Sequence, residues 1–154
     1  MYLCYPLMKV MLQRVQTIYL FISAVLSGGI IFLVPFWENT EGTIYYLLDL
    51  FNQTDIKLST LLIGFVISTL LALIAIFTFK NRKQQIAINR FNIVINFYLL
   101  GIIVYHLLTL PGESNISEKG IGLFIPELVI VLLVLANKAI QKDEKLVKSV
   151  NRLR

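Results

Sequence analysis

The sequence predicts an all-α integral membrane protein, a four-helix bundle with both termini in the cytoplasm. Three observations support this fold class: the composition, the length of the apolar stretches and the distribution of lysine and arginine. Of 154 residues, 57% are hydrophobic and 15% are charged. Soluble domains carry roughly 25% charged residues, so this chain lacks the polar side chains to cover a globule in water. A single cysteine, Cys4, excludes an intrachain disulfide framework.

Stretches of about 20 residues without charge mark the crossings, because a spanning helix must cover a hydrocarbon core of ~30 Å at ~1.5 Å per residue. The four predicted helices cover about residues 15–36, 58–79, 91–110 and 122–140. The fourth is the weakest, because Glu127 interrupts its apolar run. Unpaired backbone groups are costly in lipid, and the runs lack the alternation of barrel strands, so helices are the only suitable element.

The chain divides into an N-terminal extension over residues 1–10, a membrane domain over residues 11–140 and a tail over residues 141–154. Met11 opens directly into the first predicted helix, so we expect the cellular protein to begin there. In the first connection, residues 44–51 are short, aromatic and apolar. They predict a helix at the level of the lipid headgroups, where tyrosine and tryptophan are favoured.

The lysine and arginine residues predict the orientation. Twelve of the 14 lie in the N-terminal segment, the connection around residues 80–90 and the C-terminal tail, while only Lys57 and Lys119 lie in the other two connections. Cytoplasmic loops carry the excess of Lys and Arg, so both termini are expected in the cytoplasm. The net charge of +5 then follows from topology and attraction to anionic lipid, and no nucleic-acid partner is needed to explain it.

Three asparagines share one face of the third predicted helix. Asn89, Asn92 and Asn96 are spaced by three and four residues. Buried amides need hydrogen-bond partners, so we expect Asn92 and Asn96 to fix the rotation of this helix against the first or second helix. A solute path lined by asparagine is the alternative interpretation.

Small residues recur every four positions in the first two predicted helices. Ser23 and Ser27 form one such ladder, and Gly64, Ser68 and Ala72 form another. Small residues at this spacing let helix backbones approach closely in lipid. Packing inside the bundle is the simpler interpretation, and a dimer face or a groove for a partner subunit is the other.

His106 and Glu127 are the ionisable residues expected at membrane depth. The helical rise places both at a similar height on neighbouring antiparallel helices, and such residues usually find a partner or mark a site. We therefore consider an intramembrane polar pair between His106 and Glu127. The simpler alternative has Glu127 reaching water beside Pro126 and His106 lying in the interfacial zone.

No catalytic, cofactor-binding or metal-binding constellation is recognisable. The single histidine and the single cysteine are predicted on opposite sides of the membrane, so they cannot form a metal site or a Cys/His pair. Glycine-rich phosphate loops and nucleophile elbows do not occur. The sequence therefore predicts a protein that is not an enzyme and has no cofactor.

The C-terminal tail predicts an amphipathic, basic helix. Apolar residues recur at helical spacing from Leu146 to Leu153, and basic residues occupy the other faces. Such a helix suits anionic lipid or a docking partner, and the acidic residues in it favour a partner over lipid alone. The candidate contact residues are Lys142, Asp143, Glu144, Lys145, Lys148, Arg152 and Arg154.

Two segments carry a family resemblance. The start of the first helix reads Met-Leu-Gln-Arg-Val-Gln-Thr-Ile-Tyr-Leu from Met11, and the tail reads Asp-Glu-Lys-Leu-Val-Lys-Ser-Val-Asn-Arg-Leu-Arg from Asp143. With Ala136-Asn-Lys-Ala-Ile, they make the chain resemble a bacterial family of unknown function, family 4293, over residues 11–154. The resemblance implies a small four-helix protein of the inner membrane, and it implies no activity, cofactor or site residue.

These observations favour a non-enzymatic accessory or scaffold subunit of the bacterial inner membrane. Its cytoplasmic tail would contact a protein partner or anionic lipid. The alternative is a small oligomeric channel or transporter that uses the polar residues of the third and fourth helices. Transporters usually show broken helices or paired charges at the membrane midplane, and this chain offers little of either.

Overall fold

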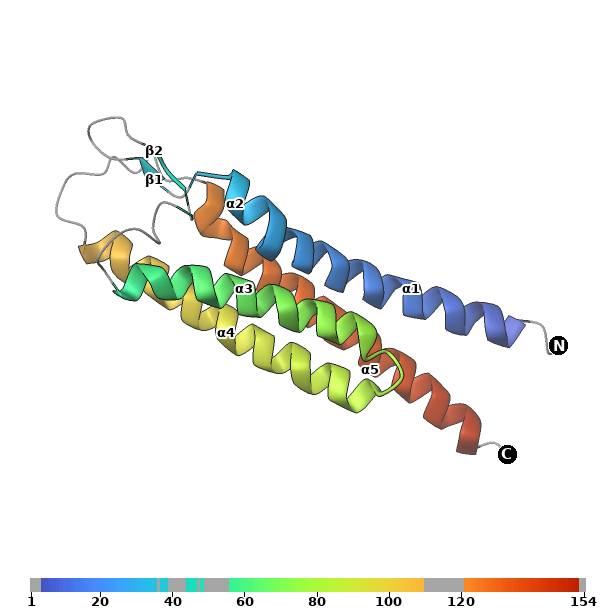
Figure 1. The fold of residues 1–154 in the computed structure, drawn as a ribbon. Helices are drawn as coiled ribbons and strands as arrows, with labels where there is room; N and C mark the ends of the chain where they lie inside the picture. The colour runs from blue at the N-terminus through green and yellow to red at the C-terminus, as the bar shows by residue number, and fades with distance from the viewer. Residues whose placement is uncertain are drawn as a thin grey trace.

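The structure is a computed structural model, and it describes residues 4–35, 37–38, 44–46, 48, 56–109 and 121–152. Its long helices lie side by side in alternating directions, and the N- and C-termini lie at the same end (Figure 1). We call this the terminal end of the bundle, and the opposite end the loop end. Neighbouring helices contact each other around a ring, in the order α1, α3, α4, α5 and back to α1.

The first helix is interrupted, whereas the other three are continuous. It comprises α1 (Cys4–Val25), a π-helical turn η1 (Leu26–Ile30) and a short α2 (Ile31–Leu33). Then follow α3 (Ile56–Phe77) and α4 (Arg82–Thr109). A 3₁₀ turn, η4 (Ile121–Phe124), leads into α5 (Ile125–Arg152).

All four predicted helices are present, but α1, α4 and α5 run beyond their predicted ends. α1 begins at Cys4, so the described part of the predicted extension is helical, and α4 begins at Arg82. α5 reaches Arg152 without a break, so the predicted tail continues the fourth helix. Counting apolar residues identifies only the part of a helix that could lie in lipid. Polar residues can continue the helix beyond that part, because each further turn forms its own backbone hydrogen bonds.

The prediction of an interfacial helix over residues 44–51 is wrong for its first two residues. Ile44 and Tyr45 form strand β2, which pairs antiparallel with β1 (Trp37–Glu38) at the loop end. The partners are Trp37 with Tyr45 and Glu38 with Ile44. β-branched and aromatic residues suit such cross-strand pairs, and the prediction ignored the short stretch that could pair with them. Residues 47 and 49–51 lie outside the described part.

Close packing of η1 against α3, and of α3 against α4, explains small residues of the first two predicted helices. A Cβ atom added to Gly28 would collide with the side chain of Thr69, so η1 and α3 can approach this closely only without one. The Ser27 Oγ and Thr69 Oγ1 atoms are hydrogen-bonded at 3.1 Å across the same contact. A Cβ on Gly64 would lie 2.5 Å from Leu99 Cδ2 of α4. The small residues at these positions pack inside the bundle.

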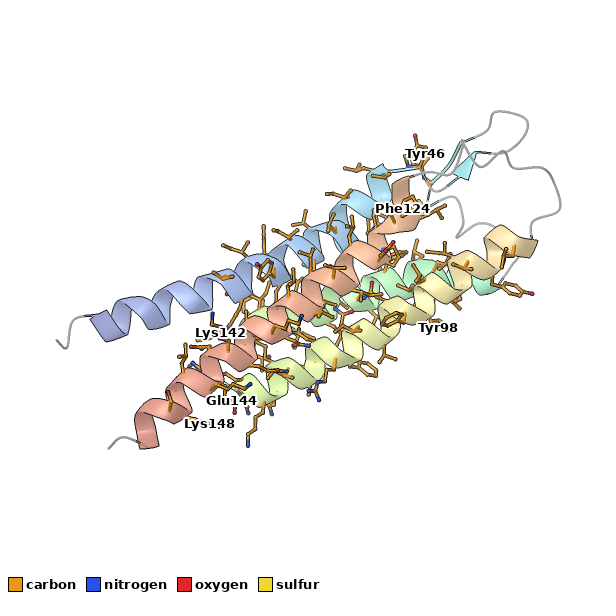
Figure 2. All side chains as sticks on the ribbon, turned by 180° about the vertical axis from the view of Figure 1, so that it is seen from behind. Tyr46, Tyr98, Phe124, Lys142, Glu144 and Lys148 are labelled. Atoms are coloured by element: carbon orange, nitrogen blue, oxygen red, sulfur yellow. The ribbon has the colours of Figure 1, made fainter. Side chains whose placement is uncertain are left out.

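The outside of the bundle is apolar along all four long helices. Exposed large side chains include Phe21, Leu70, Phe97 and Val131, one from each helix, and Figure 2 shows such side chains projecting from the sides of the bundle. Within the described residues, four helices are long and apolar enough to cross a membrane: Val15–Leu33, Ser59–Phe77, Arg82–Tyr105 and Gly122–Ser149.

Candidate functional site

The interior of the bundle is polar toward the terminal end. We call this region the polar layer. It contains eight of the ten buried polar side chains among the described residues: Gln16 of α1, Ser68 of α3, Gln85, Asn89, Asn92 and Asn96 of α4, and Asn137 and Asp143 of α5. The other two, Ser23 of α1 and Ser27 of η1, donate hydrogen bonds to carbonyl oxygens of their own helix. Each is at most 7% exposed, and such a concentration of buried polar side chains is unusual because each needs a partner.

α4 contributes half of the polar layer through a single stripe. Gln85, Asn89, Asn92 and Asn96 are spaced by four, three and four residues, so they lie on one face of the helix. The same face continues toward the loop end with the buried Leu99 and Ile103. The inward face of α4 therefore changes from amide to aliphatic along its length.

Two of these asparagines bind α3. Asn92 Nδ2 donates to the Ser68 carbonyl oxygen at 3.0 Å, and Asn96 Nδ2 lies 2.8 Å from Ser68 Oγ. Asn96 Nδ2 also lies 3.0 Å from Asn92 Oδ1, which joins the two amides on their own helix. The structure thus places Asn92 and Asn96 in hydrogen-bonding contact with Ser68 of α3.

The other two amides of the stripe reach α5 and the end of α3. Asn89 Nδ2 donates to Asn137 Oδ1 at 3.1 Å, which joins α4 to α5. Gln85 Nε2 donates to the carbonyl oxygen of Ala75 at 2.9 Å, near the C-terminal end of α3. One face of α4 therefore holds both neighbouring helices by hydrogen bonds from amide side chains.

An ion pair closes the terminal end of the polar layer. Arg82 Nη2, at the start of α4, lies 2.7 Å from Asp143 Oδ2 of α5, and the two side chains are 18% and 3% exposed. The contact has the distance of an ion pair but not the alignment of a hydrogen bond. Asp143 is thus buried inside the chain, which corrects the expectation that it belongs to an exposed contact surface.

Several amide atoms in the polar layer have no hydrogen-bond partner among the described residues. They are Gln16 Nε2, Gln85 Oε1, Asn89 Oδ1 and Asn96 Oδ1. Gln16 and Gln85 also line a cavity of about 320 Å³ at the terminal end, between α1, the end of α3 and the start of α4. Unsatisfied buried polar atoms are costly, so these positions are candidates for contact with a ligand or solvent.

The remaining predicted contact residues lie on the terminal part of α5. Lys142, Lys145 and Lys148 are exposed, and Glu144 pairs with Lys148 across one helical turn at 2.7 Å. Figure 2 shows Lys142, Glu144 and Lys148 on this part of α5. The side chains of Arg152 and Arg154 lie outside the described part.

The predicted pair of His106 and Glu127 lies partly outside the described residues. The structure gives the backbone of His106 in α4 but not its side chain, so the pair stays a prediction. The Glu127 side chain is exposed in the first turn of α5, whereas Ile125 and Val129 beside it are buried. In this fold Glu127 is separate from the polar layer.

Sequence reasoning missed Gln16, Gln85, Asn137 and the Arg82–Asp143 pair. Helical spacing alone could have identified two of these residues. Gln85 lies four residues before Asn89, on the face that Asn89, Asn92 and Asn96 share. Asp143 continues the buried series Val129, Leu133, Ala136 and Ile140 at the same helical spacing. No comparable signal identified Arg82 as the partner of Asp143, because that contact joins two helices distant in sequence.

The geometry and the comparisons together define the class of protein. The chain is a four-helix bundle with an apolar outside, four helices capable of spanning a membrane and a hydrogen-bonded polar layer inside. Among the described residues, no group of three or more His, Cys, Asp or Glu side chains could hold a metal ion.

A family model described as "Domain of unknown function (DUF4293)" matches residues 12–153, and the chain belongs to this family. The match begins beyond the predicted extension over residues 1–10 and includes nearly all of the tail. No curated protein and no solved structure matches the chain.

Proposed function

We propose that this protein is a non-enzymatic accessory or scaffold subunit of the bacterial inner membrane. Four helices able to cross a membrane and an apolar outside support its placement in lipid. The termini and the α3–α4 connection share one end of the bundle (Figure 1). Because the chain segments at this end contain most of the lysine and arginine residues, the positive-inside rule favours a cytoplasmic location for it.

The observation that carries the scaffold role is the division of α5 into a buried face and an exposed basic face. Asp143 faces Arg82 inside the bundle, while Lys142, Lys145 and Lys148 are exposed. Fixing a charged helix face on a rigid bundle reduces the ordering cost when a partner binds. We infer that these three lysines contact an acidic surface of a membrane or cytoplasmic protein.

Replacing the three lysines together with glutamine tests this role without disturbing the buried face. Cross-linking in intact cells, followed by purification in a mild detergent, should give a stoichiometric partner with the wild type and lose it with the variant. Lys80, Lys83 and Arg90 are also exposed at this end, so replacing them with glutamine provides a control with the same change in charge. Equal loss in both variants, or no partner with the wild type, would contradict the scaffold role.

Orientation has a separate test. A phosphatase that is active only outside the cytoplasm and a fluorescent protein that folds only inside it can each be fused after Arg154. We expect fluorescence and no phosphatase activity. The opposite result would place the exposed lysines on the other side of the membrane and would remove a cytoplasmic partner from consideration.

A small oligomeric channel or transporter is the second candidate. The amide oxygens of Asn89 and Asn96 favour it, because neither has a hydrogen-bond partner among the described residues. Both atoms are buried at successive heights along α4, where they are available to a polar solute. Proteoliposomes containing the wild type should then conduct a small solute or ion, and Asn89→Leu should abolish the flux. Glu127→Gln should have little effect, because Glu127 is exposed away from this stripe.

A further inference from the structure

The cavity at the terminal end has a polar wall and an apolar wall. Its volume of about 320 Å³ lies at the lower end of the range of roughly 300–1,000 Å³ for small-molecule sites. The polar wall comprises Gln16 and Thr17 of α1 with Arg82 and Gln85 of α4, and the apolar wall comprises Ile76, Phe77 and Phe79. Such a division suits a ligand that has a polar part and a hydrocarbon part.

The polar wall offers a donor and an acceptor that the described residues leave without partners. Gln16 is 6% exposed and Gln85 is 3% exposed, so both are buried. Gln16 Nε2 has no acceptor, and Gln85 Oε1 has no donor, in the part of the chain that the structure describes. The amide nitrogen of Gln85 is already bound to the Ala75 carbonyl at 2.9 Å. Because this bond holds the Gln85 amide, its oxygen remains available to accept from water or from a ligand that carries an N–H or O–H group.

The charges around the cavity favour an anion. Arg82 lines the cavity, and its Nη2 atom is paired with Asp143, while a guanidinium has five N–H donors in all. Lys80 and Lys83 are exposed on either side of Arg82 in sequence. Guanidinium groups suit phosphate oxygens in particular.

The apolar wall opens onto the outside of the bundle. Phe77 is 78% exposed and Phe79 is 52% exposed, so both rings face the medium at the end of a helix capable of spanning the membrane. The end of a helix that spans a bilayer lies near the membrane interface. The ligand's hydrocarbon part can therefore remain in the bilayer while its polar part enters the cavity.

We propose that this cavity binds the headgroup of an anionic phospholipid that carries both a phosphodiester and hydroxyl groups, as phosphatidylglycerol does. Arg82 and the Gln16 amide donate to the phosphate oxygens, and a headgroup hydroxyl donates to Gln85 Oε1. Ile76, Phe77 and Phe79 contact the glycerol backbone and the start of the acyl chains. The proposal rests on the membrane placement argued above but not on the scaffold role.

Native mass spectrometry of the full chain tests the proposal. The delipidated protein in mild detergent is mixed with equal amounts of phosphatidylglycerol and of phosphatidylethanolamine or phosphatidylcholine. We expect phosphatidylglycerol adducts to predominate. Gln16→Leu should weaken their binding by about tenfold, because it removes one hydrogen bond to a charged group. Gln85→Glu should weaken it at least as much, because it places a negative charge in the cavity.

Gln84→Glu is the matched control for charge. Gln84 precedes Gln85 and its side chain is exposed, so the same substitution adds a negative charge outside the cavity and should leave the adducts unchanged. If Gln85→Glu fails to fold, as judged by circular dichroism and gel filtration, Gln16→Leu decides alone. No preference for phosphatidylglycerol, or equal effects of Gln84→Glu and Gln85→Glu, would overturn the proposal.

Two further measurements distinguish a lipid ligand from a soluble phosphate and test the membrane placement. Glycerol 3-phosphate and inorganic phosphate are added as competitors, and displacement of the lipid by either at micromolar concentration would overturn the choice of a lipid in favour of a soluble phosphate. Membrane placement is measured separately, by retention of the protein in membranes after an alkaline wash. Protein retained there without a lipid preference would refute the headgroup site alone, whereas protein released by the wash would refute the membrane placement as well.

Discussion

The two ends of the bundle hold the same helices together by different means. Toward the loop end most buried side chains are aliphatic or aromatic, as with Leu61, Phe65, Leu99 and Ile103. Toward the terminal end they also include several amides and an ion pair. Lipid is as apolar as leucine, so aliphatic side chains associate in a membrane only through close packing, whereas amides gain hydrogen bonds. The comparison predicts that shape decides stability at the loop end and polar pairing decides it at the terminal end.

Loss of the ion pair is expected to have the largest effect. Arg82→Leu leaves Asp143 buried without its cation, and breaking a buried pair in this way costs about 3 kcal/mol. The free energy of unfolding, measured by titration with a denaturing detergent in mixed micelles, should fall by that amount. Lys83→Leu, at an exposed neighbouring position, should change it little.

The double variant Arg82→Leu/Asp143→Leu makes the test specific. Removing both charges eliminates the unpaired buried group, so most of the lost stability should return. A double variant as unstable as Arg82→Leu alone would show that the pair acts through packing. The contrast between the two ends would then disappear.

Overpacking toward the loop end of the bundle is expected to cause the second-largest loss of stability. Gly64→Val places a side chain against Leu99, where even a Cβ would lie 2.5 Å from Cδ2, and such overpacking costs about 2 kcal/mol. Gly101 is the matched control, because a Cβ there meets nothing within 4 Å. Gly101→Val should leave the unfolding free energy close to that of the wild type, and equal losses at both positions would indicate helix propensity rather than packing.

Loss of one interhelical amide contact should have a smaller effect. Asn96→Leu keeps the branched shape and the number of side-chain heavy atoms but removes the contact with Ser68 Oγ at 2.8 Å. Interhelical hydrogen bonds in membranes average about 0.6 kcal/mol, so a loss of about that size is expected. In a double-mutant cycle with Ser68→Ala, the two losses should be less than additive. Additive losses would mean that Asn96 and Ser68 do not stabilise each other.

The exposed lysines should contribute least to stability. Lys148→Gln removes the surface pair with Glu144, and such pairs often contribute nothing measurable. The unfolding titration should therefore superimpose on that of the wild type, even if the lysines are needed for partner binding. A clear loss of stability would show that this face packs within the protein, and it would remove the basis for treating it as a contact surface.

Local patterns in the sequence were sufficient to find the helices and one face of the polar layer. Apolar stretches located the four spanning candidates, and helical spacing placed Asn92 and Asn96 on a common face. Local patterns failed where the partner lies far away in the chain. Residues 44–45 form a strand because 37–38 pair with them, and Asp143 is buried because Arg82 faces it.

Apolar length and helical spacing, read along the chain, determined that this protein has four long helices able to cross a bilayer, because a helix satisfies its own backbone locally. They also determined which α4 residues share a face. Only the tertiary structure decided which helices those amides bind, that α5 buries Asp143 against Arg82, and that Gln16 and Gln85 meet at one cavity. These contacts join residues separated by tens of positions, and helix packing rather than local propensity fixes which of them meet.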